Sequence, residues 1–287
     1  MTRESTQAIA DALARGATKL EASGIDDARR EASSLMAFVL AKSSAFIFAH
    51  PEYELTTEEL KAFDSVLERR AAREPFHYIV GKKEFYALEF AVAPGVLIPR
   101  PETELLVEEA INILSELRNP RIFEIGVGSG CISISILHNI PLATAFGVDI
   151  SEIALEIAAK NAEYHKVADR LTLQHGDVYQ GVEGKFDLIV SNPPYIPDSD
   201  LALLQQEVRS FEPHSALFGG DDGLDIVRRI IADAPKFLEK GGHILIEIGF
   251  TQAARVIELY DDAIWCECGF IRDLQGIERI AKARLRE

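Results

Sequence analysis

Strand-like and helix-like segments alternate along the last two thirds of the chain, from about residue 120 onward. The apolar runs that predict strands cover residues 121–126, 144–150, 171–176, 186–192, 242–249, 263–269 and 279–285. Helical segments fall between most of them, and parallel strands need such crossover connections. We therefore predict an α/β fold whose mainly parallel, seven-stranded sheet carries helices on both faces.

The first 75 residues have a different pattern, in which apolar residues recur at helical spacing. One helix is predicted around residues 9–20, and a second over 28–40 after a candidate N-cap at Asp26. A third begins with Thr56 and Glu59, the spacing of a capping box, and ends before Pro75. Residues 1–75 are therefore predicted to form a small helical domain.

Residues 76–97 are predicted to form a β-hairpin connector. They are rich in strand formers such as Phe85, Tyr86 and Phe90, and Gly81 and Pro94-Gly95 interrupt them. A stiff loop over residues 98–104 then leads into a predicted helix over residues 105–117. Residues 98–287 make up the predicted α/β domain.

The first strand of this domain ends in a glycine-rich loop, Gly126-Val127-Gly128-Ser129-Gly130. Glycine lets the backbone turn tightly and approach a ligand closely. The loop follows a strand and opens a helix, and Asp149 ends the next strand about 20 residues later, where a carboxylate can bind ribose hydroxyls. This pattern predicts a cofactor that contains adenosine.

Two further features distinguish this loop from a dinucleotide site. It lacks the third glycine of the dinucleotide spacing, and Glu124 precedes it. Both features favour an adenosyl ligand with an amino-acid tail, and Glu124 would receive the ammonium group of that tail or a water bound to it. Asp177, after the third strand, could bond the adenine amino group. The alternative is that the glycines serve only close packing and that the aspartates cap helices, although Ser151 is a better cap than Asp149.

The segment Asn192-Pro193-Pro194-Tyr195 follows the fourth strand, and we call it the Asn-Pro-Pro-Tyr clamp. Proline fixes φ and has no N–H group, so the carbonyls of Asn192 and Pro193 can be held away from the sheet. With the Asn192 side-chain oxygen they form acceptors suited to a planar –NH2 group, and Tyr195 offers a flat stacking face. The alternative is a simple turn that ends the strand.

The glycine loop and the clamp should share one crevice, because ligands of open α/β sheets bind beyond the carboxyl ends of the strands. Together they predict methyl transfer from S-adenosylmethionine to nitrogen, with S-adenosylhomocysteine as the product. Asn192 and Pro193 would orient the –NH2 group and stabilise the positive charge that develops as nitrogen attacks. Pro194 and Tyr195 would complete the substrate pocket.

Composition narrows the partners. A net charge of −16 makes the chain a poor non-specific binder of nucleic acid and suits a basic protein partner. No apolar run is long enough to span a membrane, so no membrane association is expected. The N-terminus has no apolar secretory segment and the three cysteines form no disulfide framework, so we expect a cytoplasmic protein. The histidines lack ligand spacing, so no metal is expected.

Over nearly its full length the sequence resembles the release factor glutamine methyltransferases, the PrmC/HemK family. The most specific match is Ile98-Pro99-Arg100-Pro101-Glu102-Thr103-Glu104, together with the Asn-Pro-Pro-Tyr clamp. Further matches are Glu74-Pro75, Gly81-x-x-Glu84-Phe85-Tyr86, Phe211-Glu212-Pro213 with Ala216-Leu217, and Arg272-Asp273-Leu274 with Glu278-Arg279.

The resemblance implies a class I S-adenosylmethionine-dependent methyltransferase domain with strand order 3-2-1-4-5-7-6. It implies that the substrate is the Gln side chain of the Gly-Gly-Gln motif in class I peptide-chain release factors, and that the product is N5-methylglutamine. The helical domain would grip the release factor. By match of position, residues 126–130, Asp149 and Asn192 would contact the cofactor, and residues 192–195 would contact the glutamine.

The sequence departs from the family pattern at two positions. Glu124 stands where Asp is usual, and its longer side chain should still reach. Val178 stands where an aromatic residue often lies beside adenine, so it would contact the cofactor without stacking. Arg100, Glu102 and Glu104 either line the mouth of the pocket or anchor the interdomain loop, and the same two roles are open for Glu212.

Two other functions fit parts of the pattern. An adenine-N6 or rRNA amino methyltransferase would use the same clamp, but it must flip a base and bind phosphates, which the acidic charge disfavours. A methyltransferase-like fold used only as a binding module would be favoured by loss of the clamp or the glycines, and both are present.

Overall fold

The computed structural model describes residues 7–287, and the chain divides into two compact units. The first comprises the chain up to Gly81 together with Gln206–Phe211, and the second comprises Lys82–Gln205 and Glu212–Glu287. Among the described residues, no helix is both long enough and apolar enough to cross a membrane.

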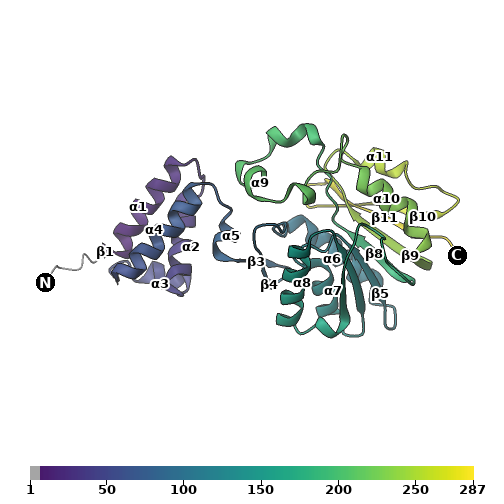
Figure 1. The fold of residues 1–287 in the computed structure, drawn as a ribbon, viewed down its shortest axis with the longest axis horizontal. Coiled ribbons are helices and arrows are strands. Elements are labelled where there is room, and N and C mark those ends of the chain that lie inside the picture. The colour runs from purple at the N-terminus through teal and green to yellow at the C-terminus, as the bar shows by residue number, and fades with distance from the viewer. Residues whose placement is uncertain (1–6) are drawn as a thin grey trace. The chain divides into compact units, whose positions relative to one another are not determined.

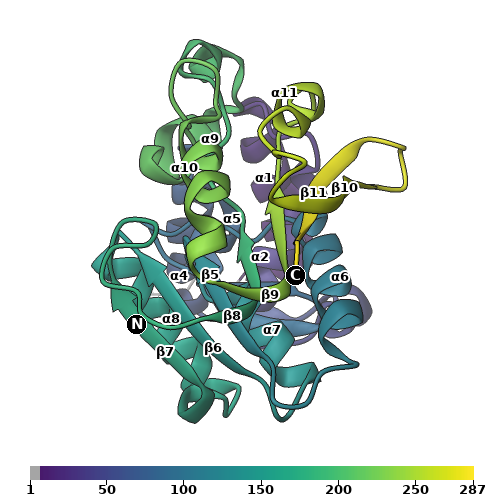
Figure 2. The same ribbon diagram turned by 90° about the vertical axis from the view of Figure 1, so that its right-hand side faces the viewer.

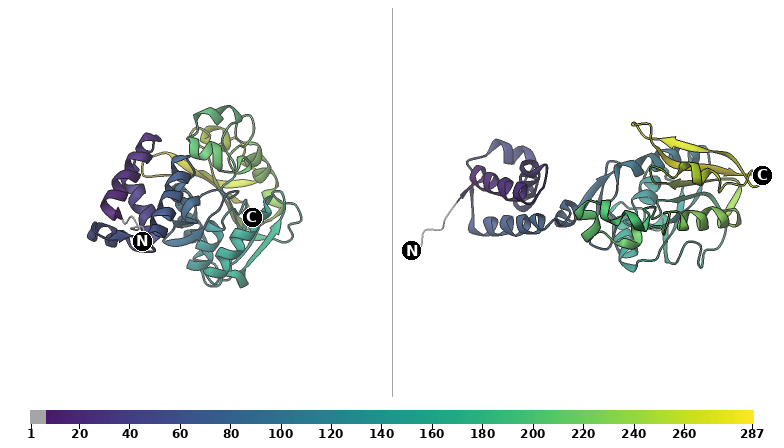
Figure 3. Two further views of the ribbon diagram at one scale, coloured as in Figure 1. Left: turned by 60° about the vertical axis from the view of Figure 1, so that its left-hand side comes forward. Right: turned by 90° about the horizontal axis from the view of Figure 1, so that it is seen from above.

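The first unit is helical (Figures 1 and 3, purple to blue, with α9 in green). Its helices are α1 (Ile9–Ala22), α2 (Ala28–Leu40), α3 (Ser44–Ala49), α4 (Thr57–Ala71), α5 (Phe76–Val80) and α9 (Gln206–Phe211). A short antiparallel pair, β1 (Gln7–Ala8) with β2 (Glu54–Leu55), ties the start of α1 to the segment before α4. Apolar faces of α1, α2 and α4 form one core that includes Leu20, Leu35 and Phe63.

The helix ends agree only partly with the sequence patterns. The capping box is confirmed, because the Thr56 hydroxyl accepts from Glu59 N and the Glu59 carboxylate accepts from Thr56 N. The N-cap at Asp26 is wrong. The N-cap of α2 is Asp27, and its side chain makes no capping bond. Pro75 does follow α4, but it also caps a further short helix, α5, which occupies the start of the predicted hairpin connector.

Helix α9 is distant in sequence from the other helices of its unit. Glu207 accepts hydrogen bonds from Arg70, at 3.1 and 3.2 Å, and from Arg73, at 2.8 Å. Arg70 is 6% exposed and also donates to Glu31 at 2.5 and 3.3 Å. A buried cation shared between two carboxylates therefore joins α9 to α2 and α4, because a buried charge needs such partners.

The second unit opens with a hairpin, β3 (Lys82–Phe85) and β4 (Leu88–Ala91). Both turn residues, Tyr86 and Ala87, have positive φ, as a type I′ turn requires. Glu104 accepts a hydrogen bond from Tyr86 N at 2.8 Å and so ties this turn to the segment before α6. A 3₁₀ turn, Pro101–Thr103, precedes α6 (Glu104–Leu114).

The remaining elements alternate, as the sequence predicts. The strands are β5 (Arg121–Ile125), β6 (Thr144–Asp149), β7 (Leu171–His175), β8 (Phe186–Ser191), β9 (Leu238–Glu247), β10 (Trp265–Arg272) and β11 (Glu278–Leu285). The helices are α7 (Cys131–Asn139), α8 (Glu152–Tyr164), α10 (Asp225–Asp233) and α11 (Ala253–Ile257). Short 3₁₀ segments cover 168–170, 198–203, 214–216 and 234–236.

Within the described residues these strands form a seven-stranded sheet in the order β10-β11-β9-β8-β5-β6-β7 (Figure 2). Numbered along the domain from β5, this is the order 3-2-1-4-5-7-6 read from the β7 edge, which confirms the predicted fold class. Strands β5 to β9 pair in parallel, and β11 pairs antiparallel with both β9 and β10. Strand β5 lies between β6 and β8, so its carboxyl end is the topological switch point.

Two apolar clusters cover the sheet. On one face α6, α7 and α8 pack against residues such as Ile122, Leu188 and Leu245. On the other face α10 and α11 pack around Phe123, Ile189 and Trp265. With both faces covered, the polar groups that end the strands are concentrated at the sheet's carboxyl edge, where loops are free to bind ligands.

Candidate active site

A cavity lies at the carboxyl ends of β5, β6, β7 and β8, within the second unit. The segments that line it leave four adjacent parallel strands, and the 95–103 loop completes one wall. The lining includes Gly126, Val127, Gly128, Ser129, Asp149, Asp177, Val178, Asn192, Pro193 and Pro194. The structure therefore brings the predicted glycine loop and the clamp together at one cavity.

The glycine loop has a conformation that other residues rarely adopt. Gly126, Gly128 and Gly130 all have positive φ. At Gly130 a Cβ atom would come within 2.8 Å of the end of the Ile134 side chain and 3.2 Å of Ala158 in α8, so a side chain there would displace the first and crowd the second. The loop thus turns sharply from β5 into α7, as a ligand-binding backbone at a helix start requires.

Asp149 holds this loop in place from the end of β6. Its two carboxylate oxygens accept from Gly128 N at 2.8 Å and from Ser151 N at 2.9 Å. Burial raises the pKa of Asp149, and these backbone donors act to lower it. The Ser151 hydroxyl caps α8, as the sequence suggests, by accepting from Ala154 N. Asp149 lines the cavity, and its predicted ribose contact stays a prediction.

Glu124 lies beneath the glycine loop and does not line the cavity. Its side chain is fully buried, and Oε2 accepts from Ser133 N at 3.0 Å. The other oxygen, Oε1, has no hydrogen-bond partner among the described residues. Burial raises the pKa of Glu124 to about 8, with the Ser133 bonds opposing the rise. Nearby, the buried Ser129 hydroxyl likewise has no partner among residues 7–287.

The segment after β7 forms another wall. Asp177 lines the cavity and pairs with Arg229 at 2.8 Å. Val178 has φ of 56°, which is strained for a β-branched residue, and its side chain is buried. Tyr179 points elsewhere, because its ring stacks on Phe237 and its hydroxyl donates to Ile230 O. Tyr179 therefore does not supply the aromatic ring that Val178 lacks at this wall.

The clamp meets the 95–103 loop through its asparagine. Asn192 Nδ2 donates to the Thr103 hydroxyl at 3.1 Å. Both residues line the cavity, as do Pro193 and Pro194. The backbone carbonyl of Asn192 faces Gly126, 4.0 Å from where a Cβ atom would lie. A Cβ atom would fit at that distance, so it is the positive φ of 75° that favours glycine at this position.

Tyr195 is not part of the cavity lining. Its hydroxyl donates to Glu247 Oε1 at 3.4 Å, and its carbonyl accepts from Gln252 Nε2 at 2.8 Å. Burial raises the pKa of Tyr195 well above its usual range, so the hydroxyl is a neutral donor. In this structure the side chain supports the clamp from behind, and its stacking on a substrate stays a prediction.

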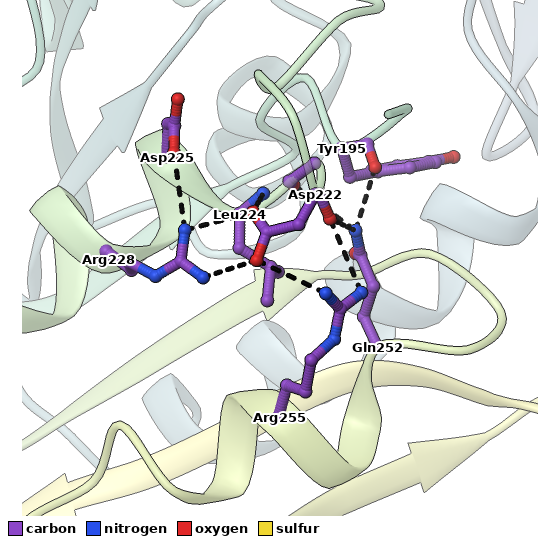
Figure 4. Close-up of polar contacts among 8 residues, drawn as sticks. Tyr195, Asp222, Leu224, Asp225, Arg228, Gln252 and Arg255 are labelled. Carbon is purple, nitrogen blue, oxygen red and sulfur yellow. Dashed lines mark hydrogen bonds and ion pairs between the residues drawn. The ribbon is translucent and has the colours of Figure 1, made fainter. Parts of the chain in front are cut away.

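A polar cluster beside α10 and α11 holds the backbone of Tyr195 in place (Figure 4). Gln252 also donates to Gly223 O at 3.2 Å and accepts from Gly249 N at 2.8 Å. Next to it, Asp222 pairs with Arg228 at 2.5 Å and with Arg255 at 3.2 Å. Hydrogen bonds and the charge of Arg228 lower the pKa of Asp222 to about 2, so this carboxylate is ionised at neutral pH.

The Ile98–Glu104 loop fulfils both of the roles that were open for it. Arg100 lines the cavity and pairs with Glu212 at 2.5 Å. Glu212 is buried and also accepts from Ile98 N at 3.2 Å, so it anchors the loop. Glu104 anchors the hairpin turn, whereas Glu102 is exposed and lies outside the cavity lining.

Sequence patterns missed three residues of this site. Thr103 lies inside the motif that carries the resemblance, so its position was visible but its contact was not. Glu247 ends β9 and Gln252 lies beyond it. Both adjoin the clamp only through the fold, and no spacing in the sequence signals that. Among residues 7–287, no group of three or more His, Cys, Asp or Glu side chains could hold a metal ion.

Two family models match the chain. The model described as the PrmC N-terminal domain matches residues 11–81, and the model described as the methyltransferase small domain matches residues 101–209. A methyltransferase of Pyrococcus furiosus has a similar fold, with a TM-score of 0.53 and 19% identity over 71% of this chain and 91% of its own.

Full-length relatives extend the match across both units. A release factor glutamine methyltransferase of Geobacter sulfurreducens is 41% identical over 266 residues, which cover 91% of this chain and 91% of the relative. One from Cereibacter sphaeroides is 41% identical over 278 residues, which cover 96% and 98%. At this identity and coverage, the chain belongs to the release factor glutamine methyltransferase family.

Proposed function

We propose that this protein methylates the side-chain amide of the glutamine in the Gly-Gly-Gln motif of class I peptide-chain release factors. The methyl donor is S-adenosylmethionine, and the products are N5-methylglutamine and S-adenosylhomocysteine. The observation that carries the proposal is the union of the glycine loop and the Asn-Pro-Pro-Tyr clamp at one cavity, in a chain of this family.

The cavity suits a ligand with an adenosyl group and an amino-acid tail. Glu124 Oε1 and the Ser129 hydroxyl are buried beside the glycine loop without partners among the described residues. Unpaired buried polar atoms are costly, and the tail of such a ligand offers a carboxylate to Ser129, which lines the cavity, and an ammonium group that would reach Glu124 through a bound water. Asp149 and Asp177 add acceptors along the wall. Bound there, the cofactor supplies a methyl group on a positively charged sulfur.

The clamp supplies what an amide nitrogen needs in order to react. Its lone pair is delocalised into the carbonyl, so an amide is a poor nucleophile. Asn192 Oδ1 and the Pro193 carbonyl accept from the two N–H groups and hold the nitrogen in line with the methyl group. They also stabilise the positive charge that develops on nitrogen. Methyl transfer leaves a positive charge on the nitrogen, which makes its N–H groups acidic. One of these protons is then lost to solvent, and the neutral methylated amide remains.

The acceptor is a protein side chain rather than a nucleobase. A net charge of −16 opposes binding to a phosphate backbone and favours a basic protein surface. The helical unit, which matches the PrmC N-terminal domain, is the part that we expect to recognise the release factor. Association should therefore weaken as salt rises.

The test is a methyl-transfer assay with labelled S-adenosylmethionine and four acceptors. These are a class I release factor, its Gly-Gly-Gln variant with Gln→Ala, duplex DNA and rRNA. We expect label on the intact release factor alone. Label on DNA or rRNA without label on the release factor would refute the proposed substrate and favour an amino methyltransferase of nucleic acid.

A variant of the clamp tests the proposed chemistry. Asn192→Ala should lower kcat by about 10²-fold or more, because it removes a preorganised polar contact made to the reacting nitrogen. The Kd for S-adenosylhomocysteine, measured by calorimetry, should change by less than about threefold. Near-normal turnover would show that Asn192 does not orient the substrate.

A further inference from the structure

Gln252 is a buried glutamine whose side-chain amide meets three backbone segments. It is 2% exposed and is the N-cap residue of α11. Its Oε1 accepts from Gly249 N at 2.8 Å, while Nε2 donates to Tyr195 O at 2.8 Å and to Gly223 O at 3.2 Å. Figure 4 shows this side chain reaching from the start of α11 to the backbone of Tyr195. The amide therefore joins the segment after β9, the loop before α10 and the end of the clamp.

The orientation of the Gln252 amide follows from these neighbours. A backbone N–H group can only donate, and a backbone carbonyl can only accept. Because Gly249 offers an N–H group, Oε1 must face it, and because Tyr195 and Gly223 offer carbonyls, Nε2 must face them. Turning the amide over would set oxygen against oxygen and donor against donor. The end of Gln252 that faces the clamp is therefore the donor end.

Gln252 is itself held in place by the helix that it begins. Its backbone carbonyl accepts from Val256 N at 2.9 Å, and its backbone N–H donates to Gly249 O at 3.0 Å. Val256 is fully buried in the apolar cluster that covers this face of the sheet. The start of α11 is therefore a fixed point from which the side chain can position the clamp.

The clamp needs such a fixed point because its two prolines have no N–H groups to donate. The stretch therefore depends on the hydrogen bonds at its two ends. At the first end, Asn192 Nδ2 donates to the Thr103 hydroxyl at 3.1 Å. At the other end, the Tyr195 carbonyl accepts from Gln252. Since proline also fixes φ, holding both ends leaves the Pro193 carbonyl between them little freedom to turn.

We propose that Gln252 is a positioning residue for methyl transfer, which sets the direction of the Pro193 carbonyl by holding the Tyr195 end of the clamp. Gln252 lies outside the cavity lining and acts through the backbone of the clamp. The inference rests on the proposed function, because it takes the Pro193 carbonyl as an acceptor for the substrate –NH2 group. When the Tyr195 end is released, this acceptor can move, and a misplacement of about 1 Å can cost about 10²-fold in rate.

Two substitutions separate the hydrogen bonds of Gln252 from its size. Gln252→Met has a side chain of similar length that cannot donate, and Gln252→Glu keeps the shape but, when ionised, cannot donate either. For both we expect kcat to fall by about tenfold or more, while KM for the release factor changes by less than about threefold. Gln275→Glu is the matched control, because it adds the same charge at an exposed position and should keep full kcat.

Calorimetry with S-adenosylhomocysteine counts the folded molecules in each preparation. Expressing kcat per molecule that binds this ligand removes any loss that comes from unfolded protein. A purely structural role of Gln252 would lower the number of binding molecules and leave this corrected kcat unchanged. A positioning role lowers the corrected kcat itself.

The pH profile of Gln252→Glu gives a readout that is specific to the donor. Burial raises the pKa of a carboxyl group, and once protonated its O–H group can donate to Tyr195 O while the other oxygen accepts from Gly249 N. Relative to the wild type, kcat of this variant should recover by about threefold or more from about pH 9 to about pH 6, because the buried carboxyl gains its proton over that range. Gln252→Met should show no recovery.

The charged groups on neighbouring elements also titrate or set the local field. They are Asp222, Arg228, Arg255 and Glu247. They are the same in the wild type and in both variants, so dividing by the wild-type kcat at each pH removes their contribution to the profile.

Amide exchange tests the tether at Tyr195 without any substrate. Directly after the clamp, Ile196 N donates to Leu217 O at 2.9 Å, and Gly219 N donates to Ile196 O at 3.0 Å. Without the tether these two N–H groups should exchange about tenfold faster in Gln252→Met than in the wild type. The amides of β5 are the control for global unfolding and should exchange at the wild-type rate.

The outcomes are distinguishable from a failure of the proposed function. If the wild-type protein transfers no methyl group to the release factor, the substrate assignment fails, and amide exchange still decides whether Gln252 holds the clamp. Unchanged exchange after the clamp would refute the tether. If the wild type is active, a normal corrected kcat in Gln252→Met would refute the positioning role. Should that variant bind no S-adenosylhomocysteine, the pH profile of Gln252→Glu decides, and a flat profile would overturn the proposal.

Discussion

At the scale of single residues, the clearest constraint on the clamp is Gly223. It has φ of 74°, and a Cβ atom there would lie 2.2 Å from the Tyr195 carbonyl oxygen and 2.6 Å from Gln252 Nε2. Both neighbours are also hydrogen-bonded to each other, so neither can move without disturbing the clamp. A side chain at Gly223 therefore acts directly on the backbone of the Asn-Pro-Pro-Tyr segment.

We predict that Gly223→Ala lowers both stability and turnover. The left-handed conformation costs about 1–2 kcal/mol for alanine, and the overpacking costs about 1–3 kcal/mol more. Gly276→Ala is the matched control, since Gly276 has a similar φ of 81° but open space around it. Urea unfolding and kcat should be measured for both. Equal effects of the two substitutions would show that the contact with Tyr195 is unimportant.

Sequence patterns predict those residues of this site that come directly after a strand. The glycine loop, Asp149 and Asn192 each follow an apolar run, and parallel strands bring such ends together. They fail for Glu247 and Gln252, whose contacts to Tyr195 cross from one strand end to another. Nothing in the local chain distinguishes these two from ordinary polar residues at or just beyond the end of a strand.

Among the helices, α9 belongs to the helical unit because of ion pairs with residues far away in the sequence. Glu207 is the residue through which α9 meets Arg70 and Arg73. Its carboxylate is largely buried, and these hydrogen bonds help to lower its pKa although burial opposes them. The contact is therefore stronger than a surface ion pair.

We expect Glu207→Ala to destabilise the helical unit by about 1–3 kcal/mol. This is less than the typical cost of leaving a buried charge unpaired, because Arg70 keeps Glu31. Glu68→Ala removes an exposed pair with Lys19 and should cost less than about 1 kcal/mol. Amide exchange in α2 and α4 of the full chain measures both. Comparable exchange in the two variants would contradict the role of Glu207.

The elements themselves were predictable where periodicity is sustained. All seven strands of the large sheet fall within four residues of their predicted limits. Most are buried apolar runs, whereas β7 and β10, at the two edges of the sheet, are only partly buried. Helices α3, α5 and α9 were not predicted, since five or six residues carry too little periodicity to stand out. Strand β9 begins before its apolar part, at Leu238, where only the pairing with Phe186 extends it.

At the scale of the whole molecule, buried carboxyl groups tie stability to pH. The pKa of Glu124 is raised to about 8 from 4.5 by burial. Between these values the folded protein keeps a proton that the unfolded chain has lost. Stability is therefore fully present below pH 4.5 as far as this group is concerned, and it falls as pH rises through about 8.

Glu124→Gln should flatten this dependence in the cofactor-free protein. Glutamine can still accept from Ser133 N but cannot ionise, so the melting temperature should fall less between pH 5 and pH 8 than in the wild type. Glu163→Gln, on the exposed face of α8, should leave the wild-type slope unchanged. A steeper fall in Glu124→Gln than in the wild type would refute the assignment.

The order of the sheet was accessible from the family resemblance and from alternation, because crossovers of one hand leave few topologies. The composition of the helical unit was not, because the chain leaves the second unit after Gln205 and returns at Glu212. No composition change marks that excursion. Residues 206–211 join the helical unit through ion pairs with residues far away in the chain, and such pairs cannot be predicted from local sequence spacing.

Because residues 206–211 complete the helical unit, that unit can be completed only late in synthesis on the ribosome. Arg70 and Glu207 are 137 residues apart, so α4 is made long before the partner that completes its buried ion pair. At elongation rates of about 5–20 residues per second the delay is roughly 7 to 30 seconds. Through that interval the nascent helical unit holds Arg70 with Glu31 alone, and it reaches its final composition only after the clamp has been translated.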